Sequence, residues 1–554
     1  MPNPTPSLPR RRDLALLLVL GLVVIGLAAR AITHPGYVDA YYYFGGARQL
    51  ARGAGFTELY QWNYVAVGQR GVTTTPPWPS HLYWMPLTSI ISAPFMAAAE
   101  RLVGTALSNA ALFRAAQVPM VLAASLLPLL SYVVAWRLAR VRRHAWAAAL
   151  LTLFSPFYFI YWANTDAFAL HGVAAAGALL AVTLVGQASR RRRAWALVAG
   201  LSAGAAHLAR ADGVLVVLVV MGWVTWLQLR RRLPLAEALV LLTLVVAGYL
   251  VVMAPWFARN LLVVGAPLAA GGAQTLWLRE YNELFNYPGG HLTPAHYFSA
   301  GWTTLLLGKW EALRTNATTL AVVQGGVVAF PFTLLGLWRC RRVPLIQISL
   351  LYGLALFGVM TFAFTWPGAR GGYFHSGAAL LPVFSAAALI GLEAGVEALS
   401  RRLRHWQPMK SIPIFTALLV LGTITLALVV FAARVIGPDP SRLAWDRQDA
   451  VYAEAGAWMA ANQATPGVVV ANNPPGWSYW TGQPAIVIPN GAAPVLLRVM
   501  DDYDARWLVL DQNYPAGLAG LYAQPESEPR LTLRARFGEP GAQPVYLLER
   551  EAAP

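Results

Sequence analysis

The sequence predicts an α-helical protein that crosses a membrane many times and carries a small α/β domain outside it. The first observation is composition, since 57% of the 554 residues are hydrophobic and 12% are charged, about half the charged fraction of an average soluble domain. The second is a series of apolar runs of about 20 residues, the length that crosses roughly 30 Å of hydrocarbon. The third is the presence of arginine clusters at alternate ends of these runs. Together these observations exclude an ordinary soluble enzyme.

Eleven apolar runs are long enough to be membrane spans. They lie at approximately 14–32, 113–136, 145–162, 166–188, 194–210, 213–229, 235–257, 315–338, 344–364, 373–396 and 412–433. The first run follows three arginines, as in a signal peptide. It has about 19 residues and lacks a convincing small-residue cleavage site, so we expect an uncleaved helix.

Half of the 42 lysines and arginines lie in six clusters between the runs. The clusters are Arg10 to Arg12; Arg137, Arg140, Arg142 and Arg143; Arg190 to Arg193; Arg230 to Arg232; Arg339, Arg341 and Arg342; and Arg401, Arg402, Arg404 and Lys410. The positive-inside rule places them in the cytoplasm, so we expect a plasma-membrane protein with its amino terminus inside and its carboxyl terminus outside. Topology and contact with anionic lipids then account for the net charge of +17, and no nucleic-acid partner is expected.

Three outer segments are longer than a turn. They are a first loop at 33–112, a second loop at 258–314 and the tail at 434–554. Residues 87–104 of the first loop are apolar, short and flanked by prolines, which predicts an interfacial helix. We therefore divide the chain into a transmembrane catalytic domain, 1–433, and an outer domain, 434–554.

The tail has a different pattern from the rest of the chain. Its short β-rich runs are GVVVANN (467–473), AIVIP (485–489) and WLVLD (507–511), and the helical patterns AEAGAWMAAN and APVLLRVMDD lie between them. This alternation predicts a small α/β domain. The tail has no Gly-rich phosphate loop and no catalytic constellation.

The sharpest local signal directly follows the first span. It is the segment from His34 to Phe44, HPGYVDAYYYF, in which Asp39 precedes four aromatic residues. An aspartate at the outer membrane boundary among aromatic rings has reduced hydration, which makes its carboxylate a better base. We therefore select Asp39 as the catalytic base. A structural alternative, compatible with the first, is that Asp39 caps the following helix, because Asp is a preferred N-cap residue.

This region resembles the first outer loop of the GT-C glycosyltransferases, in the branch of the protein O-mannosyltransferases and bacterial aminoarabinose transferases (glycosyltransferase family 39-like). The resemblance rests on Asp39 after the first helix, then ARQLARGAGF, PPWPSHLYWMPLTS and a helix ending in RLVG. Further matches in the same order are FRAAQVPMVLAA, NTD at 164–166, HLARADG at 207–213 and PWFARNLLVVGAPL at 255–268. The resemblance implies a GT-C fold, Asp39 as catalytic base and a polyprenyl monophosphate carrying one sugar as donor.

Two positions depart from this family. Many relatives carry a second acidic residue directly after the first, where this chain has Ala40. Relatives often carry a charged residue beside the prolines, where this chain has Ser80 and His81. The resemblance therefore implies the role of Asp39 without specifying the sugar or the acceptor. By analogy it also implies that the tail covers the active site or selects the acceptor.

A lipid-phosphate donor requires cations at the outer face, and arginine offers phosphate planar, bidentate donors. Arg259 at the end of the seventh span and Arg370 in TWPGARGGYFHS are the leading candidates, with Arg210 as a third. The alternatives are structural. Arg210 is close enough to Asp212 to pair with it across a turn, and Arg259 can extend toward lipid headgroups.

Asp166 at the outer end of the fourth span is a further candidate, because ionisable residues at membrane depth are usually functional. We expect it to bind the acceptor or to orient the active site; the alternative is that Asp166 and its neighbours cap the fourth span. Tyr373, His375 and His81 are candidates for binding the donor phosphate or sugar, with a purely structural histidine as the alternative for His375.

No metal and no other cofactor are expected. The single cysteine, Cys340, excludes a disulfide framework and a CxxC metal site. The candidates Asp39, Asp166, His81 and His375 do not form an HxxxH or DxD spacing, whereas divalent ions need several convergent ligands.

The sequence thus predicts an inverting glycosyltransferase, transferring a hexose or pentose on the outer face of the membrane. Its expected partners are a polyprenyl-phosphate-linked sugar donor, a lipid, glycan or protein acceptor, and membrane lipids. Two alternatives stay open. One is an O-antigen ligase or polymerase that uses a diphosphate-linked glycan, and the other is a lipid or sugar transporter, which needs broken helices or charges near the middle of the membrane.

Overall fold

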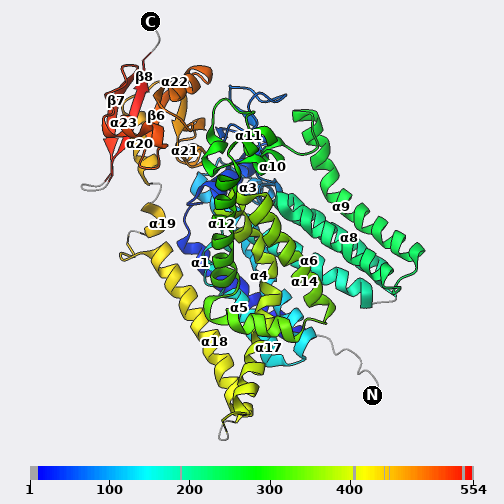
Figure 1. Ribbon diagram of the computed structural model, residues 1–554. Helices are drawn as coiled ribbons and strands as arrows, with labels where there is room; N and C mark the ends of the chain where they lie inside the picture. Colours follow the sequence, from blue (N-terminus) through cyan, green and yellow to red (C-terminus); the bar gives the residue numbers. More distant parts are fainter. Residues whose placement is uncertain are drawn as a thin grey trace. The chain divides into compact units, whose positions relative to one another are not determined.

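A computed structural model of the chain describes residues 10–187, 190–403, 407–441, 443–447, 450–538 and 543–551 (Figure 1). Arg404, a member of the last predicted basic cluster, lies outside these residues. The chain forms two compact units. Unit 1 comprises Met1–Ala31, Val118–Trp256 and Lys309–Val435, and unit 2 comprises Ile32–Gln117, Phe257–Gly308 and Ile436–Pro554. The structure is mostly helical and has a small sheet in unit 2.

Eight helices in the described part of the chain are long and apolar enough to cross a membrane. They are α1 (Arg11–Ala31), α4 (Asn109–Ala139), α6 (Phe168–Gln187), α8 with the turn before it (Ala211–Leu229), α9 (Leu235–Val264), α14 with its last turn (Pro344–Ala363), the segment from α15 to α17 (Thr365–Ser400), and α18 with its last turn (Pro408–Ile436). The prediction of a multi-pass helical membrane protein is therefore confirmed.

Three of the eleven predicted spans take a different form. The span predicted at 145–162 contains α5 (Arg142–Leu153), which has 12 residues because Ser155 and Pro156 interrupt the helix. The span predicted at 194–210 is α7 (Arg192–Ala209), an 18-residue helix that begins at arginines. The span predicted at 315–338 is broken between Trp302–Gln324 and Val327–Arg339, which meet at 95°. Gly326 at the break has a φ of 68°, a conformation that favours glycine.

Helices in unit 1 approach each other closely where both carry glycine. α13 (Phe330–Arg339) and α17 (Leu381–Ser400) pack through Gly336 and Gly391. A Cβ on Gly336 would lie 1.9 Å from the carbonyl oxygen of Ala387, and a Cβ on Gly391 would lie 1.8 Å from that of Phe332. Small residues permit this backbone contact, which is a common way for membrane helices to associate.

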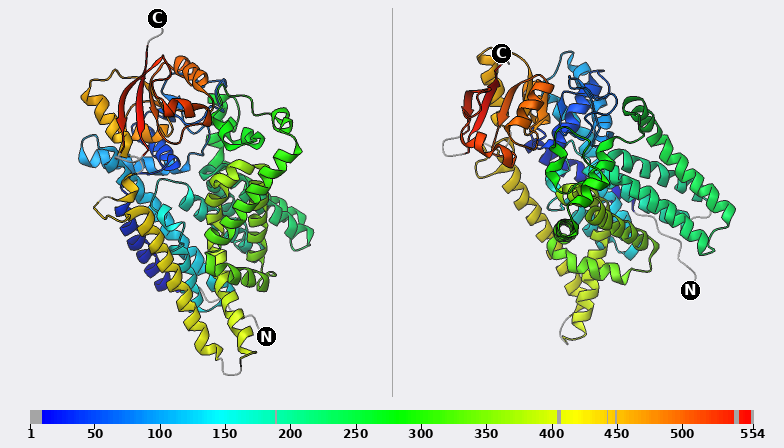
Figure 2. Two further views of the ribbon diagram at one scale, coloured as in Figure 1. Left: turned by 60° about the vertical axis from the view of Figure 1, so that its left-hand side comes forward. Right: turned by 45° about the horizontal axis from the view of Figure 1, so that its top comes forward.

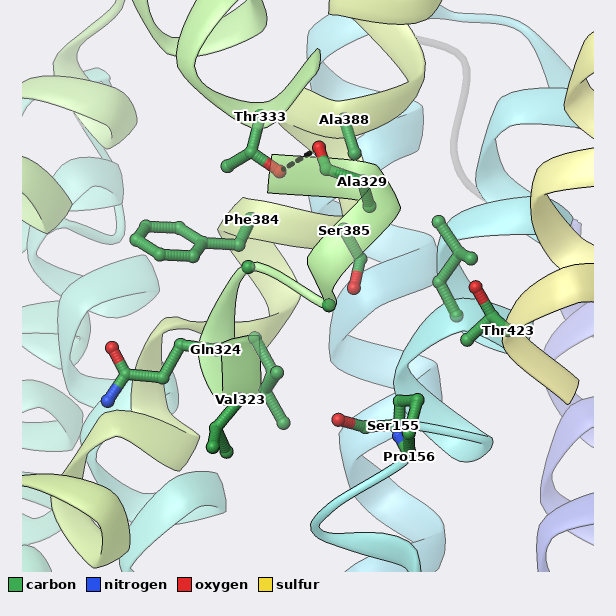
Figure 3. A pocket seen from close by; sticks show the side chains of 14 residues that line it. Ser155, Pro156, Val323, Gln324, Ala329, Thr333, Phe384, Ser385, Ala388 and Thr423 are labelled. Carbon is green, nitrogen blue, oxygen red and sulfur yellow. Dashed lines mark hydrogen bonds between the residues drawn. The ribbon is translucent and has the colours of Figure 1, made fainter. Parts of the chain in front are cut away.

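A cavity of about 30 Å³ lies beside the broken helix in unit 1 (Figure 3). Its walls carry hydroxyl groups from Ser155, Thr333, Ser385 and Thr423, and the Thr333 hydroxyl donates to the Ala329 carbonyl at 3.0 Å. The lining has no ionisable side chain. The volume suits one or two water molecules, so this cavity offers no acid, base or cation for catalysis.

Unit 2 contains a six-stranded sheet in the order β2-β5-β4-β6-β8-β7. The strands are β2 (Tyr60–Gln61), β4 (Val468–Ala471), β5 (Ala485–Val487), β6 (Ala505–Leu510), β7 (Leu531–Phe537) and β8 (Val545–Arg550). The first four strands in the order run parallel to one another. β8 pairs antiparallel with both of its neighbours, β6 and β7. β4, β5 and β6 match the three runs predicted in the tail. β2 belongs to the first outer loop, so the sheet is built from two distant parts of the sequence.

Helices cover both faces of this sheet (Figure 2). Successive residues of a strand point to opposite faces. Val469 accordingly packs with Met459 of α20 (Ala450–Ala461), whereas Val470 packs with Met500 of α22 (Ala493–Asp502). The tail therefore has the layered α/β architecture that its sequence predicts. Whether 434–554 folds as a domain of its own stays a prediction.

Short elements complete unit 2. The first loop contains α2 (Val38–Ala51), β1 (Thr57–Glu58), β3 (Trp78–Pro79) and α3 (Leu87–Val103); the second contains α10 (Ala270–Gln274), α11 (Pro294–Ser299) and the start of α12 (Trp302–Thr319). The tail adds α19 (Ala444–Arg447), α21 (Pro474–Thr481) and α23 (Ala519–Ala523). The helix predicted at 87–104 is present as α3, and its interfacial position stays a prediction.

Candidate functional site

Asp39 lies in the first turn of α2, after the end of α1 at Ala31, and its side chain is half-buried. The N-cap residue of α2 is Tyr37, whose side chain makes no capping hydrogen bond. Asp39 therefore does not cap the helix; its negative charge instead favours the start of α2 through the helix dipole. The four aromatic residues after Ala40 are all buried. Because consecutive residues of a helix point in directions about 100° apart, α2 is fixed by packing around most of its circumference.

In unit 2, Tyr42 of α2 forms a polar group with three residues from outside that helix, Glu58, His81 and Arg259. The backbone N–H of His81 donates to the Tyr42 hydroxyl at 2.9 Å, and the His81 Nδ1 lies 3.2 Å from the Trp84 carbonyl oxygen. Burial lowers the pKa of His81 to about 3, so its imidazole is neutral at physiological pH. His81 therefore offers hydrogen bonds to a ligand rather than a positive charge.

Glu58 was not expected to be a functional residue. Its side chain is buried, and burial raises the pKa of the Glu58 carboxyl well above its usual range, against the opposing effects of Tyr42, the His81 backbone and the Arg259 charge. The sequence places Glu58 in a polar loop with no distinguishing pattern. Its burial depends on the pairing of β1 with β3 and on Arg259 from another part of the chain.

Arg259, a leading phosphate candidate, contacts the first outer loop. Its Nη2 donates to the carbonyl oxygens of Ser80 at 2.8 Å and Phe56 at 3.3 Å, and its Nη1 donates to Asn260 at 2.9 Å. These bonds give Arg259 a structural role that the sequence did not predict. These hydrogen bonds occupy N–H donors of the Arg259 guanidinium. A phosphate bound at Arg259 would therefore share the guanidinium with the carbonyl groups of the loop.

Asp166 and His375 meet in unit 1. The His375 Nε2 lies 3.2 Å from the Asp166 Oδ2, and the His375 Nδ1 lies 2.8 Å from the Gly371 carbonyl oxygen. The imidazole stacks on Phe168, with ring centroids 3.9 Å apart. Asp166 also accepts from the Ala167 backbone N–H at 2.5 Å. The two sequence candidates thus form one group, and Asp166 also orders the segment before α6.

A carbonyl oxygen is only an acceptor, so the His375 Nδ1 donates its hydrogen to Gly371. The other ring nitrogen, Nε2, faces the Asp166 carboxyl.

Arg210 pairs with Asp212, as the structural alternative anticipated. Its Nε lies 3.1 Å from Asp212 Oδ1 and 2.8 Å from the Ser376 hydroxyl, and that hydroxyl also donates to Asp212. Ser376 follows His375 on α16 (Tyr373–Gly377). Ser376 was not among the predicted site residues, because a serine in an apolar run carries no signal of its own.

Arg370 and Tyr373 differ in exposure. Arg370 is exposed, in the turn Gly368–Gly372 that precedes α16. Tyr373 is buried, and its carbonyl oxygen accepts from Gln324 at 3.2 Å. Arg370, Tyr373 and His375 thus lie on one kinked segment, but Arg370 is exposed whereas Tyr373 packs into the core.

The site candidates divide between the two units. Asp39, His81 and Arg259 belong to unit 2, and Asp166, Arg210, Arg370, Tyr373 and His375 belong to unit 1. In unit 1, Asp166 and His375 offer a carboxylate oxygen and an imidazole nitrogen, which are ligand types that divalent cations take. The expectation that no metal is needed stays a prediction.

Comparisons with known proteins identify the fold. No protein-family model matches the sequence, and no curated protein matches it. The archaeal oligosaccharyltransferase AglB from Archaeoglobus fulgidus, in complex with an inhibitory peptide and a dolichol-phosphate, is similar with a TM-score of 0.58 and 14% identity, over 90% of this chain and 69% of that chain. ArnT from Cupriavidus metallidurans, bound to undecaprenyl phosphate, has a TM-score of 0.56 and 15% identity, over 98% of this chain and 99% of that chain.

A third similar structure is the arabinofuranosyltransferase AftD from Mycobacteria, with a TM-score of 0.51 and 14% identity, over 99% of this chain and 42% of that chain. All three are GT-C glycosyltransferases. At these identities the similarity concerns the fold, and it confirms the fold that the sequence motifs imply. The chain is a multi-pass membrane protein with the fold of the GT-C glycosyltransferase superfamily.

Proposed function

We propose that this protein is a glycosyltransferase that moves one sugar from a polyprenyl monophosphate to an acceptor hydroxyl on the outer face of the membrane. The observation that carries the proposal is the position of Asp39, in the first turn of α2 after α1 ends, in a chain with the GT-C fold. The lipid phosphates in the similar structures, dolichol-phosphate with AglB and undecaprenyl phosphate with ArnT, support a lipid-phosphate donor. The basic clusters support a cytoplasmic amino terminus and an external tail.

The reaction is a single displacement. The Asp39 carboxylate takes the proton of the acceptor hydroxyl while the acceptor oxygen bonds to the anomeric carbon. The bond from that carbon to the phosphate oxygen breaks, and the polyprenyl phosphate leaves with the electron pair, so the anomeric configuration inverts. A general base of this kind contributes about 10²–10⁴-fold to the rate.

The leaving phosphate needs positive charge at its oxygens. We assign this role first to Arg370, because its side chain is exposed, and next to His375, which lies five positions later on the same kinked segment. Arg210 and Arg259 have donors engaged by Asp212 and by loop carbonyls. Their removal is expected to disturb the structure as well as the binding of the donor.

The test is release of polyprenyl phosphate by purified protein in detergent, supplied with a panel of polyprenyl-phosphate sugars and with water as acceptor. We expect release from one donor, and a fall of about 10²–10⁴-fold in Asp39→Asn with donor binding retained. The matched control is Asp504→Asn, which neutralises a tail carboxylate whose side chain is 99% exposed.

Normal turnover by Asp39→Asn would remove Asp39 from the mechanism. Cleavage of a diphosphate-linked glycan, with no release from any monophosphate donor, would instead indicate a ligase or polymerase.

A further inference from the structure

A short helix of the tail contacts the turn that leads into α2. In α19 (Ala444–Arg447), the Trp445 indole Nε1 donates to the His34 carbonyl oxygen at 2.8 Å, across 411 positions of sequence. Asp446 Oδ1 accepts from the Thr33 hydroxyl and lies 3.2 Å from His34 Nδ1. Burial lowers the pKa of His34 to about 4 although Asp446 opposes it. At neutral pH the contact is therefore a hydrogen bond and not a pair of full charges.

Gly36 shows how tightly Trp445 fits this turn. Gly36 has a φ of 80°, and a Cβ there would lie 2.5 Å from the Cε2 and Cζ2 atoms of the Trp445 ring. Real Cβ atoms do not approach so closely, so either the ring or the backbone would have to move. The Trp445 side chain is buried, and the Tyr37 ring packs edge-on against it at 6.4 Å.

A second tail helix, α21, contacts residues that precede and follow Asp39 in the sequence. Trp480 of α21 lies against His34, with ring centroids 5.3 Å apart, and its Nε1 donates to the Tyr41 hydroxyl at 3.2 Å. Tyr41 is two positions after Asp39, and Gly36 is three positions before it. The tail thus contacts residues on both sides of the proposed base: the backbone of His34 before it and the side chain of Tyr41 after it.

We infer that Trp445, seated on Gly36, is a positioning residue for Asp39, so that the tail contributes to the chemical step itself. The inference rests on the proposed function, in which Asp39 is the base. It differs from a role of the tail in covering the site or selecting the acceptor, because it predicts a defect even when water is the acceptor. A displacement of about 1 Å in a reacting group is enough to cost on the order of 10²-fold in rate.

The test measures kcat and KM for polyprenyl phosphate release in the full-length protein. Trp445→Phe removes the hydrogen bond to His34 and part of the ring, and we expect kcat to fall about tenfold with the KM for the donor within about twofold. Gly36→Ala is expected to lower kcat by about 10–100-fold. The matched control is Trp507→Phe, which removes an indole N–H bond of 3.0 Å to Thr465 within the tail and is expected to leave kcat near the wild-type value.

The double variant Gly36→Ala/Trp445→Phe separates steric contact from local backbone strain. The strain of alanine at positive φ is the same in either background, whereas the clash is relieved by the smaller ring. We expect Gly36→Ala to cost less in the Trp445→Phe background than in the wild type. Additive effects, or kcat values like that of Trp507→Phe in both single variants, would overturn the inference while leaving Asp39-dependent release intact. Absence of Asp39-dependent release in the wild type would instead overturn the proposed function, and the inference with it.

Discussion

Replacing Glu58 by glutamine should stabilise the protein increasingly as the pH rises. Glu58 is buried next to Tyr42 and His81, and burial raises the pKa of its carboxyl well above the ordinary value of 4.5. In the unfolded chain the carboxyl loses its proton near pH 4.3, whereas in the folded protein it keeps the proton to higher pH. Between these two values a rising pH therefore favours unfolding.

The expected magnitude follows from proton linkage. One proton bound in the folded state and absent in the unfolded state changes the free energy of unfolding by about 1.4 kcal/mol for each pH unit. Glutamine has nearly the shape of the protonated acid and does not titrate. Between pH 4.5 and the raised pKa of the carboxyl, the free energy of unfolding of Glu58→Gln relative to wild type should thus rise by about 1.4 kcal/mol per pH unit. For a chain of this length that corresponds to about 1 °C in Tm per pH unit, since Tm shifts by roughly 1 °C per kcal/mol.

Thermal unfolding in detergent at pH 5, 6 and 7, followed by tryptophan fluorescence, measures this difference. The control is Glu526→Gln, an exposed tail carboxylate, for which we expect no comparable trend. If the Tm difference between Glu58→Gln and wild type stays constant from pH 5 to 7, Glu58 is ionised in the folded protein and its assignment as a buried acid is wrong.

Two further predictions concern packing in unit 1. Asp13→Asn should lower the free energy of unfolding by about 2 kcal/mol, because the buried Asp13 carboxylate accepts from Arg142 at 2.8 and 2.6 Å and hydrogen bonds to charged groups contribute on this scale. Thermal unfolding measures this loss. The control is Glu237→Gln, which breaks an ion pair with Arg193 whose two side chains are 23% and 65% exposed; we expect it to change stability by less than about 1 kcal/mol. Equal losses in the two variants would refute the expected difference. Gly391→Ala should prevent accumulation of folded protein, since its Cβ would lie 1.8 Å from a backbone oxygen, whereas Gly422→Ala, with no atom within 4 Å, should be tolerated. Size-exclusion profiles of both variants check this, and a normal profile for Gly391→Ala would contradict the packing.

The membrane helices show most clearly what could be predicted from the sequence. Hydropathy is a sum over neighbouring residues, so α1, α4, α6, α8 and α9 were found from apolar runs alone. The same signal failed at Gly325 and Gly326, because an apolar run continues through the break while the backbone turns by 95°. A break of this kind depends on what the two halves pack against.

The candidate site was predicted in part. The position of Asp39 at the start of a helix follows from its place after the first span, and Asp166 and His375 were selected separately before the structure placed them 3.2 Å apart. Glu58 and Ser376 were missed. Each becomes notable only through burial and through partners that are distant in sequence, which no local pattern records.

By itself the sequence determined which segments are apolar enough for a membrane, where the basic clusters lie, the strands of the tail and the motifs that resemble GT-C enzymes, because all of these are properties of short stretches. Only the tertiary structure decided that β2 of the first loop joins the sheet of the tail, that Arg259 binds loop carbonyls, and that Trp445 rests on Gly36. Those contacts join residues up to 425 positions apart, as in the pairing of Tyr60 with Ala485. They depend on shape, down to the missing Cβ of one glycine, and such complementarity arises only when the chain is packed.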